Sequence, residues 1–388
     1  MKKEKRKNAR KKKKTKGKRL ALLEAIATIT GTAIGAGFLG IPYVFSKSGF
    51  FIGLAHLILL CLFVMLTNLC FGELILRTKA IHQLPGYISY YLGKPARLIM
   101  HFAMAFGIYG AIIAYLIGEG QVLSFIFTGS TASSIYFSIA FFALIALLCY
   151  YGISMLEKGE TAVMFIVITI SLVLAIAFLP KFNFQNISSF SKSPVDWFLP
   201  YGVVLFSYLC FSALPEVEQE IKGNEKVLKK AIIFGMAIPF FIYFIFTLAI
   251  VGFAGKATPE IATIALGKIP SLLAVFTMFT ACFALTNAIR DMYELDLKIR
   301  HFYAWLLATF LPFLLFLLIA LFKLAGFVKI IGITGAISGG LTGILILLAH
   351  SRAKLGDRKP EYSIKLSLPL RAALIIVFIL GMIAEILF

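Results

Sequence analysis

Eleven long apolar runs constrain this chain more than any other feature of its sequence. A helix that crosses a bilayer needs about 20 consecutive, mostly apolar residues. Runs that meet this criterion lie at 21–46, 49–76, 98–127, 134–152, 161–180, 197–217, 228–253, 270–290, 303–322, 327–349 and 369–387. The connections between these runs are short. We therefore expect an all-α, multi-pass membrane protein without a separate soluble domain.

The composition agrees with a membrane protein and excludes several other classes. Of the 388 residues, 60% are hydrophobic and 14% are charged, whereas a soluble domain carries about 25% charged residues. All five cysteines fall inside apolar runs, without the spacing of a disulfide framework or a metal site. The sequence shows no convergent cluster of acids and histidines and no continuous polar pore. It therefore predicts neither an enzyme nor a channel, and no cofactor.

The positive charge is concentrated on one side of the predicted membrane domain. Residues 1–19 hold thirteen Lys and Arg residues, and we expect this segment to be a disordered cytoplasmic tail that binds anionic lipid headgroups. No folded nucleic-acid-binding domain accompanies it, so a nucleic-acid partner is not predicted. The tail and the even-numbered loops carry 31 of the 38 Lys and Arg residues. The positive-inside rule then predicts a cell-membrane protein with a cytoplasmic N-terminus and an outward C-terminus.

Two of the predicted spans contain residues that interrupt helices. The stretch "GTAIGAGFLGIP" (31–42) lies in the first span, and "PYGVVLFSYLCFSALPEVEQE" (200–220) covers the sixth. Inside a helix, glycine costs about 1 kcal/mol relative to alanine, and proline about 3 kcal/mol. Spans one and six occupy matching places if residues 20–180 and 194–349 form two structural repeats, with 369–387 as an extra helix. Matching breaks of this kind indicate a transporter binding site near the bilayer midplane.

A break of this kind exposes groups of opposite polarity. The N-terminus of a half-helix presents amides and a positive dipole end, which suit a carboxylate. The C-terminus presents carbonyls, which suit an ammonium group or a metal cation, so a zwitterionic amino acid uses both. Close helix packing would also explain Gly31 and Gly35, but it does not account for Pro42 or for the matching break in span six.

The broken segments also carry a family resemblance. The stretches "GTAIGAGFLGIPYVFSKSGF", "LPGYISYYLGKPAR" and "FSYLCFSALPEVEQEIKGNEKVLKKAI" resemble the amino acid–polyamine–organocation superfamily. The similarity is closest to the branch of amino acid/auxin permeases and aromatic amino acid permeases. It implies a LeuT-like 5+5 inverted repeat with discontinuous helices 1 and 6, plus an eleventh transmembrane helix. It also implies ion-coupled amino acid symport by alternating access; the alternative is a membrane sensor that binds an amino acid without net transport.

The resemblance assigns roles to the first break. Gly35 belongs to the predicted substrate site, and the amides of Ala36 and Gly37 would receive the substrate carboxylate. The carbonyl of Ala33 would face the substrate amino group. Tyr115, in span three, could reach the carboxylate with its hydroxyl, or could simply be a packed tyrosine.

The resemblance assigns roles in span six as well. It places Phe206, Ser207 and Tyr208 at the unwound stretch and makes Phe211 a candidate aromatic gate. Cys210 stands where the family has a glycine, so the sequence leaves the position of this break less well defined.

Two coupling ions, H⁺ and Na⁺, are compatible with the sequence. In the implied fold a sodium ion would lie between spans one and eight. The carbonyls of Gly31 and Ile34 and the hydroxyls of Thr277 and Thr280 would then be its ligands. The family tends to have paired hydroxyls in span eight, but Ala281 follows Thr280 here, which weakens the sodium hypothesis.

Proton coupling needs a titratable group near the transport path. Glu119 is the most deeply placed acid, and an ionisable residue at membrane depth is functional by default. Lys158 is a second candidate, since it could pair with Glu160 near the cation position, or both could lie at the headgroups. We favour protons slightly over sodium. The sequence determines neither the amino acid transported nor an oligomeric state.

Charged residues of both signs follow span eight. Asp291 and Glu294 lie near Arg290 in the sequence. Such a mixture suggests either a salt-bridged gate or a solvated loop, and we expect the loop.

Overall fold

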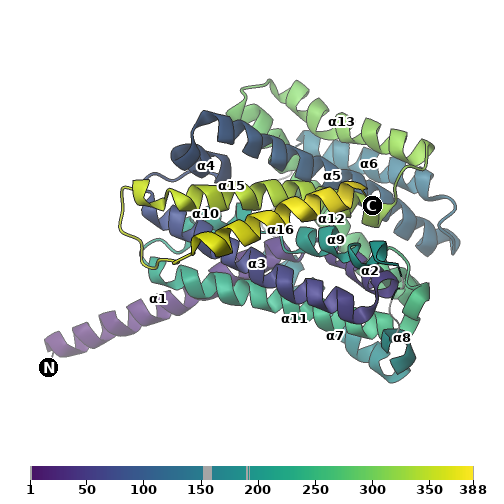
Figure 1. The fold of residues 1–388 in the computed structure, drawn as a ribbon, viewed down its shortest axis with the longest axis horizontal. Coiled ribbons are helices and arrows are strands. Elements are labelled where there is room, and N and C mark those ends of the chain that lie inside the picture. Colours follow the sequence, from purple (N-terminus) through teal and green to yellow (C-terminus); the bar gives the residue numbers. More distant parts are fainter. Residues whose placement is uncertain (1, 152–159, 189–190, 192, 388) are drawn as a thin grey trace.

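The computed structural model describes residues 2–151, 160–188, 191 and 193–387, and these residues form a bundle of helices (Figure 1). The first half of the chain contains α1 (Lys2–Ala33), α2 (Ile41–Ser48), α3 (Phe50–Arg77), α4 (Leu84–Leu92), α5 (Lys94–Thr128), α6 (Ser134–Tyr151), α7 (Glu160–Phe178) and α8 (Phe184–Ser188). The second half contains α9 (Pro200–Ser207), α10 (Leu214–Glu220), α11 (Leu228–Ala254), α12 (Lys268–Asp291), α13 (His301–Leu321), α14 (Phe327–Thr334), α15 (Gly340–Ser351) and α16 (Leu368–Leu387).

Each predicted span coincides with a helix or with a pair of helices. Among the described residues, nine helices are long and apolar enough to cross a membrane, and the bent pair that includes α1 and α2 makes a tenth. The predicted span 161–180 corresponds to α7, whose fully described apolar part, Val167–Lys181, is shorter than a usual span. The hydrophobic pattern therefore located the spans because each needs a long apolar stretch.

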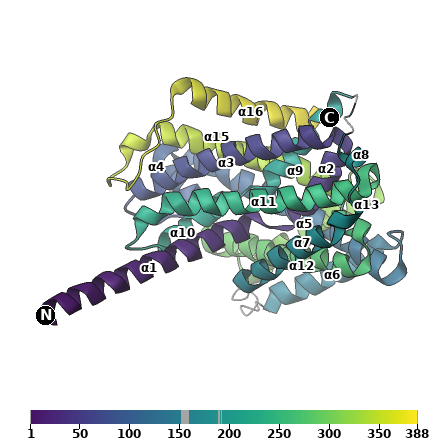
Figure 2. The same cartoon turned by 90° about the horizontal axis from the view of Figure 1, so that it is seen from below.

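The basic N-terminal segment differs from the expected disordered tail. Helix α1 begins at Lys2 and runs without interruption into the first span. Figure 2 shows its first half projecting away from the bundle. Lysine and arginine are good helix formers, and the apolar part of the same helix provides its nucleus. The predicted boundary between residues 19 and 20 thus lies inside a continuous helix.

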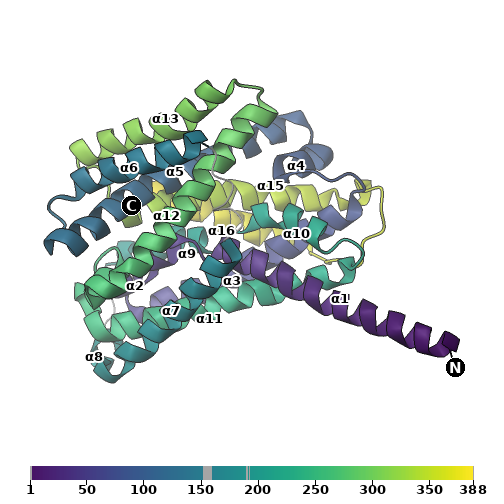
Figure 3. The same ribbon diagram turned by 180° about the vertical axis from the view of Figure 1, so that it is seen from behind.

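The two broken spans lie in the middle of the bundle. The first consists of α1, a short 3₁₀ helix η1 (Ala36–Gly40) and α2, with a bend of 47° at the break. The second consists of α9, the 3₁₀ turn η5 (Phe211–Ala213) and α10. Helix α11 packs against both α1 and α3, and α9 packs against η1. Figure 3 shows α12 crossing the opposite face of the bundle, where it contacts α5, α6 and α7.

The bundle has two distinct ends. Helices α4 and α10 and the α15–α16 connection lie at the end from which α1 projects, whereas α2, α8 and the C-terminus lie at the other (Figure 1). At the first end, the Glu73 carboxylate of α3 accepts hydrogen bonds from Arg77 (2.8 Å), His350 (3.1 Å) and Ser363 (2.9 Å). Because Ser363 belongs to the α15–α16 connection, Glu73 holds that connection against α3.

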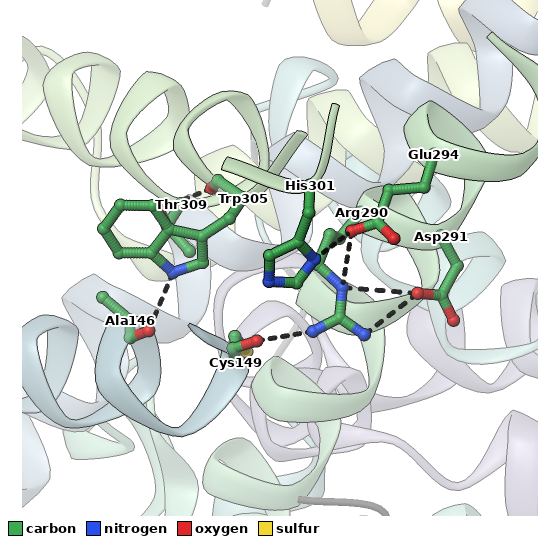
Figure 4. Close-up of polar contacts among 8 residues, drawn as sticks. All are labelled: Ala146, Cys149, Arg290, Asp291, Glu294, His301, Trp305 and Thr309. Carbon is green, nitrogen blue, oxygen red and sulfur yellow. Dashed lines mark hydrogen bonds and ion pairs between the residues drawn. The ribbon is translucent and has the colours of Figure 1, made fainter. Parts of the chain in front are cut away.

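The charged residues after span eight form a network rather than the expected solvated loop (Figure 4). The Arg290 guanidinium pairs with Asp291 (3.0 Å) and Glu294 (3.5 Å) and donates to the Cys149 carbonyl at the end of α6. His301, the first residue of α13, lies 2.7 Å from Glu294. Arg290 is only 12% exposed, so the expectation of a solvated loop is wrong for these residues. The network joins the ends of α6, α12 and α13.

We expect Arg290→Gln to lower the thermal midpoint of the detergent-solubilised protein. The substitution removes two ion pairs and the donor to a carbonyl of α6, and leaving a buried polar group unsatisfied costs about 1–3 kcal/mol. Arg300→Gln is the matched control, because Arg300 is exposed and exposed charges contribute little. Equal midpoints for the two variants would show that the network does not stabilise the bundle.

Candidate functional site

The first break presents amides at the middle of the bundle. Helix α1 ends at Ala33, Gly35 is extended (φ −86°, ψ −161°), and η1 begins at Ala36. The first amides of a helix have no acceptor within it, so those of Ala36 and Gly37 point out of η1. The sequence-based assignment of these two residues to the first break therefore agrees with the backbone geometry.

The second break lies slightly later than the sequence predicts. Helix α9 ends at Ser207, the segment from Tyr208 to Cys210 is irregular, and η5 begins at Phe211. Phe206 and Ser207 are thus the last residues of α9, and of the three residues predicted to unwind only Tyr208 lies in the irregular segment. Cys210 has a φ of −136°, a value that residues other than glycine adopt readily. This explains why a cysteine is accommodated where the resembled family has a glycine.

The two breaks are in direct contact. A Cβ atom added to Gly37 would lie 2.6 Å from Cδ1 of Phe206 and 3.0 Å from Oγ of Ser207. Only a glycine allows this approach without displacing the α9 side chains. The amide end of η1 therefore lies beside the carbonyl end of α9, so groups of opposite polarity meet in one place.

Tyr243, on α11, connects the carbonyl ends of both half-helices. Its hydroxyl lies 2.7 Å from the Ala33 carbonyl oxygen and 2.9 Å from that of Ser207. The side chain is fully buried. A hydroxyl carries one proton, so it donates to one of these carbonyls at a time, and each carbonyl oxygen has two lone pairs. The two carbonyl oxygens can therefore accept a hydrogen bond from a further donor.

The sequence analysis missed Tyr243. It lies in the apolar run "FFIYFIF" of span seven, where a tyrosine looks like any other core aromatic residue. Only the packing of α11 against both breaks distinguishes it.

Aromatic rings pack next to the ring of Tyr243. The Tyr243 ring stacks on Phe38 of η1 with centroids 5.9 Å apart, and Phe38 meets Phe246 edge-on at 5.0 Å. Tyr208 is tilted against Tyr243 at 5.5 Å, but its hydroxyl donates to the Leu57 carbonyl of α3 at 3.3 Å. Tyr208 therefore packs against Tyr243 with its ring, and its hydroxyl is directed at α3.

Helix α5 brings one hydroxyl and one carboxyl group to the site. The Tyr115 hydroxyl would lie 3.7 Å from a Cβ at Gly35 and interacts with the backbone of Ala36. Glu119 is one helical turn away on the same face of α5 and is 1% exposed. Its Oε2 atom has no hydrogen-bond partner among the described residues. Tyr115 thus lies at the first break, and a buried carboxyl lies beside it; contact of its hydroxyl with a substrate carboxylate stays a prediction.

The sodium candidates come from two helices. The hydroxyls of Thr277 and Thr280 donate to carbonyls one turn earlier in α12, which leaves their oxygen lone pairs for another partner. Gly31 and Ile34 lie at the end of α1, and in the described part of the chain neither forms a hydrogen bond with Thr277 or Thr280. The remaining ion-coupling candidate, Lys158, lies outside the described residues.

Comparison with a family model decides the family. A model described as the tryptophan/tyrosine permease family matches residues 18–265, well over half of the chain. The matched region includes both breaks and Tyr243. The chain belongs to the tryptophan/tyrosine permease family.

Curated relatives of this permease are named as amino acid transporters. Tyrosine-specific transport system 1 of Haemophilus influenzae is 26% identical over 341 residues, 79% of this chain and 82% of the relative. Glutamine transporter 2 of Aliivibrio fischeri is 23% identical over 232 residues, 58% of this chain and 59% of the relative. Tyrosine-specific transport system 2 of H. influenzae is 27% identical over 230 residues, 57% of this chain and 55% of the relative. The chain thus spans less than two thirds of the last two relatives.

A solved structure confirms the predicted fold class. The crystal structure of MhsT in complex with L-phenylalanine superimposes with a TM-score of 0.62 and covers 94% of this permease and 97% of that chain. The sequence identity is 14%, so the comparison shows the fold alone. MhsT is a LeuT-fold transporter, and the permease therefore has the LeuT-like architecture that its family resemblance implied.

We expect Gly37→Ala to destabilise the permease and Gly35→Ala to be tolerated. The added methyl group at Gly37 overlaps Phe206, and overpacking of this kind costs about 1–3 kcal/mol, whereas the methyl at Gly35 makes an ordinary contact with Tyr115. Thermal unfolding of the two purified variants tests this difference. A Gly37→Ala midpoint at or above that of Gly35→Ala would contradict the close contact between the breaks.

Proposed function

We propose that the permease is a secondary active transporter that binds a zwitterionic amino acid between the two broken spans. The amides of Ala36 and Gly37, with the Tyr115 hydroxyl, receive the carboxylate. The carbonyls of Ala33 and Ser207 receive the ammonium group. The main support is that the Tyr243 hydroxyl lies within hydrogen-bonding distance of both carbonyl oxygens. The two acceptors proposed for the ammonium group therefore lie close together.

The proposed substrate is a large apolar or aromatic amino acid, with tyrosine as the first candidate. The aromatic rings of Phe38, Phe206 and Phe211 lie next to the two breaks, and rings of this kind favour offset or edge-on contacts with an aromatic ligand. The names of the H. influenzae relatives support tyrosine, whereas the A. fischeri relative makes glutamine the competitor to test.

The same geometry supports our proposal that transport occurs by alternating access. A substrate held by backbone groups of α1, η1 and α9 moves with those half-helices, and in this fold transport largely consists of one bundle rocking or gating around a fixed site. Tyr243 moves with them because α11 packs against α1.

Protons are our preferred coupling ion, and Glu119 is the proposed carrier. It is buried, its Oε2 has no partner among the described residues, and it lies one turn from Tyr115. Sodium bound by Gly31, Ile34, Thr277 and Thr280 is the alternative.

The proposed location is the cell membrane, with α1 beginning in the cytoplasm and α16 ending outside. Thirteen Lys and Arg residues among the first nineteen support this orientation. The same charges are expected to attract anionic headgroups.

Purified permease in proteoliposomes should accumulate labelled L-tyrosine when an inward proton gradient is imposed. A sodium gradient alone should give much less accumulation, and excess L-phenylalanine should compete better than L-glutamine. Binding of L-tyrosine without accumulation under either gradient would refute transport and support an amino acid sensor instead.

Glu119→Gln should abolish proton-driven accumulation while preserving exchange of internal for external L-tyrosine, because the amide cannot carry a proton. Thr280→Val tests the sodium alternative. It removes only a proposed sodium ligand and should leave proton-driven uptake intact. Loss of uptake in Thr280→Val together with normal uptake in Glu119→Gln would overturn proton coupling.

Tyr243→Phe should lower the stability of the substrate-free permease and increase the stabilisation produced by substrate. Without the hydroxyl, the two buried carbonyls lose the one donor that they share, at a cost of about 1–3 kcal/mol, and the ammonium group of L-tyrosine replaces it. An analogue without the amino group, 3-(4-hydroxyphenyl)propionate, should not produce this extra stabilisation.

Tyr362→Phe is the matched control for Tyr243→Phe. The Tyr362 hydroxyl also donates to a carbonyl, that of Leu69 at 2.8 Å, but in the α15–α16 connection. Its loss should lower stability without changing the response to L-tyrosine. Equal substrate responses in the two variants would contradict the ammonium site.

A further inference from the structure

A polar cavity lies apart from the proposed substrate site, at the end of the bundle from which α1 projects. It has a volume of about 450 Å³ and lies between the start of α4 and the first turns of α5. Its polar lining consists of His82, Gln83, Ser89, Tyr90, Arg97 and His101. None of the functions proposed above uses this cavity.

The chemistry of the lining favours an anion. Arg97 and His101 are one turn apart on α5, so their side chains share a face, and His101 is oriented by a 2.8 Å contact from Nδ1 to the Arg97 carbonyl. Residues 78–118 contain no Asp or Glu. Among the described residues, Arg97 forms no ion pair with a carboxylate. A planar guanidinium of this kind suits phosphate, which it binds with two parallel hydrogen bonds.

The surface next to the cavity favours a lipid as the source of that phosphate. Leu98 and Phe102 follow Arg97 and His101 by one residue each, and they are 72% and 58% exposed. They extend along α5 from the cavity into its apolar, membrane-spanning part. A phospholipid would place its phosphate beside Arg97 and an acyl chain along these side chains, whereas a free phosphate would use only the polar part.

We propose that this cavity binds the headgroup phosphate of an anionic phospholipid, in the leaflet on the side from which α1 projects. Basic pockets at helix ends on this side of a membrane protein are suited to anionic headgroups. The site is separate from the basic N-terminal segment, because its lining residues come from α4, from α5 and from the turn before α4.

The cavity is connected to the second broken span by two contacts. The His82 ring meets Tyr87 of α4 edge-on, with centroids 5.4 Å apart. The Tyr87 hydroxyl donates to Glu218 of α10 at 2.7 Å. A lipid that holds His82 and α4 in place therefore stabilises the contact between α4 and α10. On the proposed function, this makes the transport rate depend on the bound lipid.

Lipid retention can be measured without any assay of transport. Permease purified from vesicles that contain phosphatidylglycerol and phosphatidylcholine is examined by native mass spectrometry. We expect wild type to retain phosphatidylglycerol preferentially. Arg97→Gln should retain about fivefold less of it, the ratio that corresponds to about 1 kcal/mol for one basic residue near an anionic surface. Arg300→Gln, which removes an exposed arginine on the same side, should retain as much as wild type.

Three outcomes would overturn the proposal. Equal retention by Arg97→Gln and Arg300→Gln would show that general surface charge, and not this cavity, attracts the lipid. Equal retention of both lipids by wild type would exclude selection for an anionic headgroup. Displacement of phosphatidylglycerol by millimolar inorganic phosphate would assign the cavity to a free anion. Because none of these readouts involves an amino acid, failure here leaves the transport proposal unaffected.

A second measurement tests the connection to α10. Uptake of L-tyrosine should rise with the phosphatidylglycerol content of the vesicles in wild type and in Arg300→Gln, but not in Arg97→Gln. Tyr87→Phe should retain the lipid and lose this dependence, because it keeps the cavity and removes the donor to Glu218. A normal lipid dependence in Tyr87→Phe would refute the connection while leaving the binding site intact.

Discussion

The hydroxyl of Tyr243 is the interaction on which the centre of this permease depends. Breaking a helix inside a membrane leaves carbonyl and amide groups without partners, at a cost of several kcal/mol each. Here the carbonyls that end α1 and α9 are both within hydrogen-bonding distance of one buried hydroxyl. That arrangement requires α11 to lie against the first broken span and α9 to approach η1. The rest of the bundle is built around these positions.

The polar chemistry at this centre comes mainly from the backbone. The groups proposed to bind the amino acid are two amides of η1 and two carbonyls at the ends of α1 and α9. Side chains add the Tyr115 hydroxyl and an aromatic surround that includes Phe38. A site of this kind recognises the part that all amino acids share through its backbone and leaves selection of the side chain to the rings around it. Recognition by the backbone on one side and by the rings on the other is consistent with relatives that are named for the transport of tyrosine and of glutamine.

The ends of the bundle carry a different kind of polar interaction. Arg290 joins α12 to α6 at one place, Glu73 fastens the α15–α16 connection across α3 at another, and Tyr87 joins α4 to α10. In each case a charged group contacts a segment that is distant in sequence. These contacts connect elements that a rocking motion would move relative to one another, and the proposed lipid site lies next to one of them.

The sequence by itself determined the spans and the fold class. Long apolar runs located each crossing, because a bilayer accepts little else, and the glycines and prolines of spans one and six located both breaks. The family resemblance of these segments then predicted roles for Ala36, Gly37 and Tyr115, and the structure places all three at the first break. The tertiary structure alone decided which buried groups meet. In an apolar run Tyr243 cannot be distinguished from other core residues, the second break begins after Ser207, and Arg290 donates to a carbonyl of α6. The reason is that apolar patterning depends on one segment at a time, whereas a hydrogen bond depends on two atoms that only folding brings together.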